Sequence, residues 1–140
     1  MLQRIQSVWL LLATTLSALS VKWSFFSGNR LNATTNAKEW VEFNATENTI
    51  ILLLTVAIAV AALVCIFMYK DRKRQLLITI SVLALSLVNL FLYFNASKGF
   101  TESNTDLTAL ISFGIPVFLV LAAIGIYKDE QLVKNADRLR

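Results

Sequence analysis

Residues 50–94 read IILLLTVAIAVAALVCIFMYKDRKRQLLITISVLALSLVNLFLYF, two long apolar runs on either side of the charged connection Lys70–Gln75. A helix that crosses the hydrocarbon core of a bilayer needs roughly 20 mostly apolar residues, and Ile50–Tyr69 and Leu76–Phe94 both meet that length. Backbone N–H and C=O groups find no water in lipid, so they must bond within each segment. The stretch therefore predicts two membrane-spanning helices joined by a tight turn.

Two further apolar runs, Ser7–Phe26 and Leu107–Tyr127, flank this pair. Within the four runs only Lys22 is charged, and it lies near an end, where its ammonium group can reach the headgroups. Of all residues, 56% are hydrophobic and 16% charged, against about a quarter charged in a soluble domain. We therefore predict an all-α fold, with residues 1–140 forming one transmembrane bundle of four helices followed by a tail at 128–140.

The basic residues are distributed unevenly about the four predicted spans. Nine of the 13 Lys and Arg residues lie on one side: Arg4, Lys70, Arg72, Lys73, Arg74, Lys128, Lys134, Arg138 and Arg140. Lys22, Arg30, Lys38 and Lys98 lie on the other. Cytoplasmic segments carry the excess of Lys and Arg, so both termini and the Lys70–Gln75 connection are predicted to be cytoplasmic.

The first run has a competing interpretation as a cleaved signal peptide. Arg4, a short apolar stretch and the small residues around Ser20 resemble the three regions of such a leader. The apolar run continues past Ser20 to Phe26, however, and its removal would leave three spans and weaken the charge asymmetry. We therefore expect the first run to be retained as a span.

The two outer segments, Ser27–Thr49 and Asn95–Asp106, are short and polar. Domains below about 40 residues usually need disulfides or metals, so neither segment is expected to have a core of its own. In the first, Ala37–Phe43 is predicted to form one or two helical turns with its two aromatic residues on one face. In the second, Thr105 or Asp106 is expected to cap the fourth helix by accepting hydrogen bonds from its first N–H groups.

Both ends of the chain carry amphipathic segments on the predicted cytoplasmic side. Lys128–Arg140 places four apolar residues at helical spacing and predicts a short amphipathic helix, and a similar stripe runs from Leu2 to Trp9. With the basic connection, these segments are expected to pack on each other, to lie on anionic lipid or to dock a protein partner. The candidate contact residues are Gln3, Arg4, Gln6, Lys70, Arg72, Lys73, Arg74, Asp129, Glu130, Asp137, Arg138 and Arg140.

Small and polar residues inside the spans predict how the helices associate, because such residues hold helices together in lipid. A carboxamide in hydrocarbon needs partners, so we interpret Asn89 as an interhelical contact rather than a substrate ligand. Pro116 cannot donate to the carbonyl of Ser112, and a kink is expected there. The isolated thiol of Cys65 is interpreted as structural. The candidate interhelical residues are Thr55, Ala59, Thr79, Ser86, Asn89 and Pro116.

Missing residue types restrict the chemistry of the chain. It has no histidine and one cysteine, so it lacks the usual haem ligands and the cysteine pair of a thiol oxidoreductase. No carboxylate lies within a predicted span, which leaves an ion-coupled exporter without an intramembrane acid. We therefore predict no enzyme activity, no cofactor and no metal site. The net charge of +4 follows from membrane orientation, and neither a nucleic acid nor a small-molecule substrate is expected.

The two ends of the sequence carry a resemblance to a known family. The opening MLQRIQ at residues 1–6, and the ending with KDE at 128–130 and ADRLR at 136–140, resemble those of a family of small four-helix inner-membrane proteins from Bacteroidota. That family is a domain of unknown function, so the resemblance implies no catalytic residue. It implies a bacterial inner membrane as the location.

Two functions remain open at this stage. One is a non-enzymatic accessory or assembly subunit of a larger membrane complex, in contact with other integral membrane proteins and with lipid; secretion or envelope biogenesis machinery is one such host. The other is a small passive channel or carrier, as a homo-oligomer, motivated by the polar line Thr79, Ser86 and Asn89 beside Pro116. The sequence identifies neither a partner nor a solute.

Overall fold

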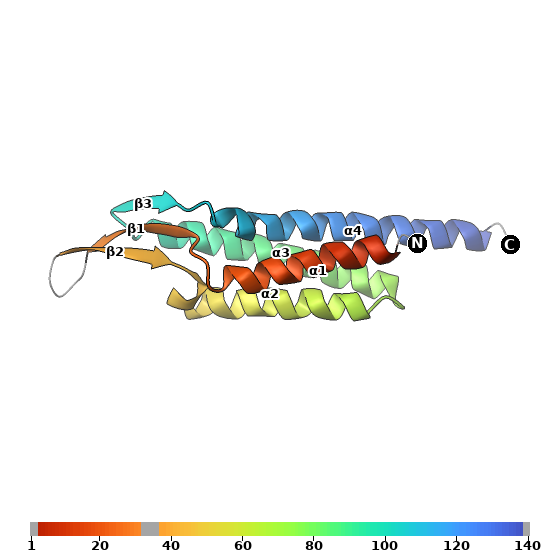
Figure 1. The fold of residues 1–140 in the computed structure, drawn as a ribbon. Coiled ribbons are helices and arrows are strands. Elements are labelled where there is room, and N and C mark those ends of the chain that lie inside the picture. The colour runs from red at the N-terminus through yellow and green to blue at the C-terminus, as the bar shows by residue number, and fades with distance from the viewer. Residues whose placement is uncertain (1–2, 32–36, 139–140) are drawn as a thin grey trace.

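The computed structural model describes residues 3–31 and 37–138 as four helices and a small sheet (Figure 1). The helices are α1 (Gln3–Ser20), α2 (Thr49–Phe67), α3 (Arg72–Ser97) and α4 (Ala109–Arg138), and a 3-10 turn, η1 (Ala45–Glu47), precedes α2. By length and composition, α2, α3 and α4 are able to cross a membrane, whereas α1 carries a shorter apolar stretch, Ile5–Ser20. Three of the four predicted spans thus coincide with helices of membrane-crossing length.

The first predicted span extends further than the helix that the structure contains. α1 ends at Ser20, where the N–H groups of Lys22 and Trp23 donate to the carbonyl of Leu19 at 3.2 and 3.3 Å. The expectation of a span that continues to Phe26 is therefore wrong. The physical reason is that Phe25 and Phe26 are buried in an aromatic cluster instead of facing lipid.

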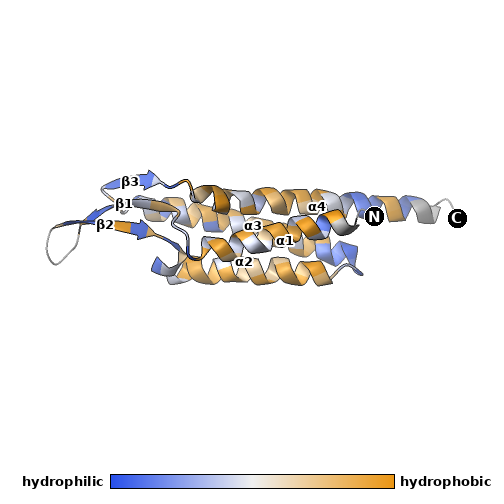
Figure 2. Cartoon of the chain, viewed as in Figure 1, coloured by the Kyte–Doolittle hydropathy of each residue, from blue (hydrophilic) through white to orange (hydrophobic). Residues whose placement is uncertain are grey.

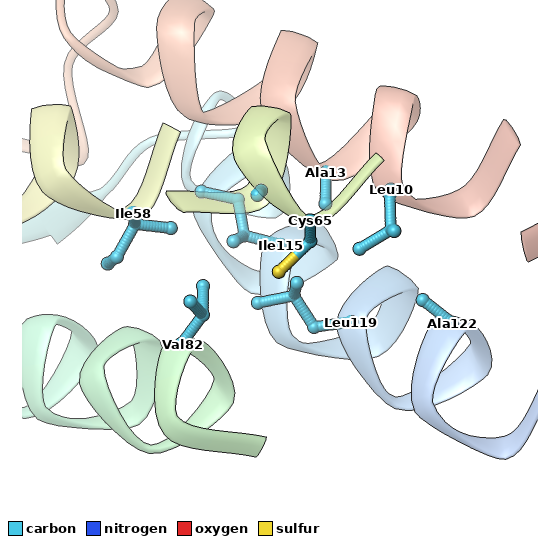
Figure 3. Close-up of a cluster of buried hydrophobic side chains, with 9 residues drawn as sticks. Leu10, Ala13, Ile58, Cys65, Val82, Ile115, Leu119 and Ala122 are labelled. Atoms are coloured by element: carbon cyan, nitrogen blue, oxygen red, sulfur yellow. The ribbon is translucent and has the colours of Figure 1, made fainter. Parts of the chain in front are cut away.

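The four helices form a bundle in which each lies between two neighbours, since α1 and α3 both contact α2 and α4. Buried positions recur every three or four residues, as at Ile51, Thr55, Ile58, Ala62 and Cys65 in α2. This spacing is typical of left-handed bundles with helices nearly parallel or antiparallel. The middle of the bundle is apolar (Figure 3), and the labelled side chains there are Leu10, Ala13, Ile58, Cys65, Val82, Ile115, Leu119 and Ala122.

Hydrophobic residues make up most of the helices (Figure 2), and many of their large apolar side chains are exposed. In α2, 28% of the most apolar window is buried inside the structure, and Leu53, Val60 and Phe67 all point outward. Exposed apolar surface of this extent marks contact with a membrane or a partner. These faces are where lipid chains would contact the bundle.

A three-stranded antiparallel sheet at one end of the bundle is the feature that the all-α prediction lacks. Its strands are β1 (Phe26–Leu31), β2 (Lys38–Phe43) and β3 (Glu102–Thr105), in the order β2-β1-β3. In β1, Phe26 lies opposite both Phe43 and Thr105. The predicted helical turns at Ala37–Phe43 are therefore wrong, because this segment satisfies its backbone groups by pairing with β1.

An aromatic cluster joins the sheet to the bundle. Phe25 stacks on Tyr93 with ring centroids 4.5 Å apart, and Phe26 stacks on Phe43 at 4.7 Å while meeting Phe100 edge to face. Such pairs contribute about 0.5–1.5 kcal/mol each beyond the area that they bury. The two outer segments thus share a core with the helices, although neither has one of its own.

Hydrogen bonds of Asp106 connect the segment that follows α1 to the start of α4. Its carboxylate accepts hydrogen bonds from the hydroxyls of Ser24 at 2.6 Å and Ser27 at 2.8 Å. The N–H of Ala109 donates to the main-chain carbonyl of Asp106 at 3.0 Å, not to its side chain. The prediction that the Asp106 side chain caps the fourth helix is therefore wrong, because its carboxylate accepts hydrogen bonds from the two serines instead.

α4 continues without a break to Arg138, and Pro116 lies inside it. The segment Lys128–Arg138, which we call the arm, is thus an extension of α4 and not the separate short helix predicted. An ion pair between Glu130 and Lys134 at 3.2 Å, one turn apart, supports the continuation. In Figure 1 the arm projects beyond the α2–α3 turn and the start of α1.

Candidate functional site

Polar side chains from α1, α3 and α4 and a main-chain carbonyl of α2 form hydrogen bonds at the end of the bundle opposite the sheet, which we call the basic end. The carboxamide nitrogen of Gln6 donates a hydrogen bond to the Gly125 carbonyl at 3.0 Å and another to the Asp129 carboxylate. Gln6 and Asp129 are each 5% exposed. A buried carboxylate is costly unless it is hydrogen-bonded, so Gln6 holds a group that the interior would otherwise disfavour.

Gly125 allows α1 to lie close to α4 at this point. A Cβ atom at this position would be 2.9 Å from Cγ of Gln6, closer than real contacts allow. The absence of a side chain therefore leaves room for the carboxamide to reach both acceptors. Gly125 belongs to the site, although the sequence marks it only as one small residue of a membrane helix.

Two further hydrogen bonds attach α3 to its neighbours at the basic end. The guanidinium of Arg72 donates to the main-chain carbonyl of Asp129 at 2.9 Å, and the carboxamide of Gln75 donates to the carbonyl of Cys65 at 2.9 Å. Gln75 is 3% exposed and continues the buried face of α3 that includes Thr79. The sequence analysis missed Gln75, yet its place four residues before Thr79 was a usable signal.

A groove of about 510 Å³ lies beside this network, between the α2–α3 turn and the arm. Five cationic residues, two acidic residues and one apolar residue line it: Lys70, Arg72, Lys73, Arg74, Lys134, Asp71, Glu130 and Val133. We call it the basic groove. Its surplus of positive charge makes it attractive to an anion.

The charges of the basic groove are only partly paired. Glu130 is engaged by Lys134, and Arg74 meets Asp71 at 4.0 Å with both side chains exposed. Neither Lys70 nor Lys73 has an ion-pair partner among the residues that the structure describes. Two ammonium groups that line the groove therefore form no ion pair within the described part of the chain.

Of the predicted contact residues, the structure brings seven to the basic end: Gln6, Lys70, Arg72, Lys73, Arg74, Asp129 and Glu130. The side chains of Gln3, Arg4, Asp137 and Arg138 lie outside the described part, as does Arg140 entirely. The sequence placed these residues together on one predicted face of the membrane. The structure instead divides them into a buried network around Asp129 and an open groove beside it.

A protein-family model matches nearly the whole sequence. The model for a domain of unknown function, DUF4293, matches residues 2–139. The chain belongs to this family. The match includes the bundle, the sheet and the arm, and it carries no activity with it. No curated protein and no solved structure matches the chain.

A second polar cluster of this family member lies between α2 and α3, nearer the sheet. The carboxamide of Asn89 donates to the hydroxyl of Thr55 at 3.0 Å, and Thr55 in turn donates to the carbonyl of Ile51. Among the residues that the structure describes, the buried carbonyl oxygen of Asn89 has no hydrogen-bond partner. Asn89 thus makes a hydrogen bond between α3 and α2.

The other candidate interhelical residues have more ordinary surroundings. Thr79 donates to the carbonyl of Gln75 and lies 3.8 Å from the sulfur of Cys65. Ser86 donates to the carbonyl of Leu83 within its own helix, and Ala59 and Pro116 are half-buried. Within the described ranges, no group of three or more His, Cys, Asp or Glu residues is arranged to hold a metal ion.

Proposed function

We propose that this protein is a non-enzymatic integral membrane protein of a bacterial inner membrane, with both termini cytoplasmic. We further propose that it acts as an accessory or assembly subunit of a larger membrane complex. Its partner would be another integral membrane protein with a cytoplasmic surface. Machinery for secretion or envelope biogenesis is one host of this kind.

The arm of α4 is the observation that carries the proposal. It extends past the ends of the other helices, and it exposes 55% of Leu132 and 44% of Val133. A helix that presents apolar residues beside charged ones is a common means of docking to a groove on another protein. Because α4 is continuous, the arm is held in a fixed direction by the bundle, which reduces the entropy lost on binding.

The proposed orientation has support from the sheet as well as from the charges. β1 and β3 come from the two outer segments, and their pairing requires both segments to lie on the same side of a membrane. The α2–α3 turn and the arm lie at the opposite end, where the basic residues concentrate. That end is the one the excess of Lys and Arg favours for the cytoplasm.

Purification in a mild detergent from the native membrane, followed by mass spectrometry, tests the docking role. We expect a stoichiometric membrane protein partner, and we expect Leu132→Ser to reduce its recovery about tenfold, as for a residue central to an interface. Leu107→Ser is the matched control, since Leu107 is 87% exposed but precedes α4 at the other end. A lone monomer in native nanodiscs, without a partner at defined stoichiometry, would contradict the proposal.

The alternative of a passive channel or carrier is less favoured by the packing. The polar line of Thr79, Ser86 and Asn89 is interrupted by an apolar layer in which Val82 packs with Ile58 and Leu119. Solute flux through reconstituted vesicles tests this alternative. Flux that falls in both Asn89→Leu and Pro116→Ala would support a channel, and flux absent from the wild-type protein would argue against one.

A further inference from the structure

The basic groove lies at the depth of a membrane where lipid phosphates occur. The exposed apolar surface of α2 ends at Phe67, and that of α3 resumes at Leu77. Exposed Tyr69 marks the boundary between them, as aromatic residues do at the headgroup level. The groove residues Lys70–Arg74 therefore come directly after the apolar layer, at the level of the headgroups.

The start of α3 carries an excess of positive charge, although its N-cap residue, Asp71, is acidic. Its first turn holds Arg72, Lys73 and Arg74 and no acidic residue, and the side chain of Asp71 makes no capping hydrogen bond. The first N–H groups of a helix give its N-terminus a partial positive charge, which cations beside it make less favourable. A bound anion would remove this repulsion and accept hydrogen bonds from the free N–H groups.

The groove also selects among anions by its lining. Lys70 and Lys73 form no ion pair with another described residue, and each can contact a tetrahedral group as a point charge. Val133 on the facing wall offers an apolar surface beside them. A ligand with a phosphate and adjacent carbon atoms could contact the two lysines and Val133 at the same time. Lipid headgroups have this composition.

We propose that the basic groove binds the phosphate of an anionic phospholipid headgroup. Lys70 and Lys73 contact the phosphate, the start of α3 supplies backbone donors, and Val133 packs on the glycerol. Binding at this position would connect the α2–α3 turn to the arm through the lipid. The inference depends on the membrane location and not on any protein partner, so it stands or falls separately from the docking role of Leu132.

The test is lipid retention and titration on the full-length protein in detergent micelles, with phosphatidylglycerol against phosphatidylcholine as probes. We expect the protein to prefer phosphatidylglycerol at least about tenfold, and Lys70→Gln and Lys73→Gln each to weaken its binding about fivefold, in line with basic residues near anionic lipid. Lys128→Gln is the matched control, because Lys128 is exposed at the same end but does not line the groove. Its effect should stay below about twofold, whereas general surface attraction would weaken all three variants equally.

A gain of binding separates the proposal from loss through misfolding. Glu130→Gln removes a negative charge from the groove and is expected to tighten phosphatidylglycerol binding about threefold. Equal binding of the two lipids, or unchanged binding in Lys70→Gln and Lys73→Gln, would overturn the inference. Inorganic phosphate that displaces the lipid at micromolar concentration would overturn the assignment to a lipid, since the site would then hold free phosphate.

Discussion

The carboxamide of Gln6, near the start of the chain, donates a hydrogen bond to the carboxylate of Asp129, near its end, and both side chains are almost completely buried. Gln6→Leu would leave that carboxylate without this donor inside the bundle. We expect the free energy of unfolding in detergent to fall by about 1.5–3 kcal/mol, the range for hydrogen bonds to charged groups. Asp129→Asn keeps an acceptor and should cost less. Gln131→Leu removes only an exposed hydrogen bond to the Tyr127 hydroxyl and should change stability by under about 0.5 kcal/mol.

Gly125→Ala tests the close approach of α1 to α4. The added methyl group would meet Cγ of Gln6 at 2.9 Å, in a buried place where the side chain has little room to move. Overpacking of this kind typically costs about 1–3 kcal/mol, and thermal unfolding in detergent measures it. Gly99→Ala is the control, because its nearest neighbour would be the Ala96 carbonyl oxygen at an ordinary 3.5 Å. Equal stability of the two variants would refute the tight contact.

The pair of Thr55 and Asn89 predicts unequal effects of two substitutions. Thr55→Val leaves the buried amide donor of Asn89 without an acceptor and should destabilise by about 1–3 kcal/mol. Asn89→Leu removes that donor together with a carbonyl oxygen that has no partner, so it should cost clearly less. Denaturant titrations of both variants in detergent show which substitution lowers the free energy of unfolding more. A larger loss in Asn89→Leu would show that this carbonyl has a partner in the membrane.

Removal of the Asp106 carboxylate should destabilise the sheet locally and leave the helix bundle folded. Asp106→Ala takes the acceptor from the hydroxyls of Ser24 and Ser27. We expect faster amide hydrogen exchange in β1 and β3 and little change in α2 and α3. Glu42→Ala, an exposed change on β2, is the comparison and should leave exchange in β1 as it is.

The proposed orientation is open to direct labelling. In a background with Cys65→Ala, a cysteine placed by Glu42→Cys should react with a membrane-impermeant maleimide from the outer side of intact cells. A cysteine placed by Gln131→Cys should react only after the membrane is opened. The reverse pattern would place the basic end outside and contradict the charge rule.

The helices were predictable because their signal is local. Apolar length alone identifies the runs at Ile50–Tyr69 and Leu76–Phe94, and lipid leaves the backbone no alternative to a helix. The end of α1 was not predictable in this way. Phe25 and Phe26 are as apolar as the helix before them, and their burial depends on Tyr93 and Phe43, far away in the sequence.

The sheet and the groove depend on pairings that a single sequence does not display. β3 reads ESNT, has no apolar alternation and becomes a strand only because Phe26–Asn29 lies beside it. The basic residues at 70–74 were recognised as a group, but their groove needs Glu130 and Lys134 on the facing wall. α4 supplies these residues because it continues as a helix beyond its apolar segment. The hydropathy of the sequence does not reveal that continuation.

The pairing of β1 with β3 also sets an order of events during synthesis. β1 is made early, yet one of its two edges has no neighbour until residues 102–105 have been made. The sheet is therefore completed only after α2 and α3 have been synthesised. Until then the nascent protein presents an open strand edge, a surface prone to pairing with other chains.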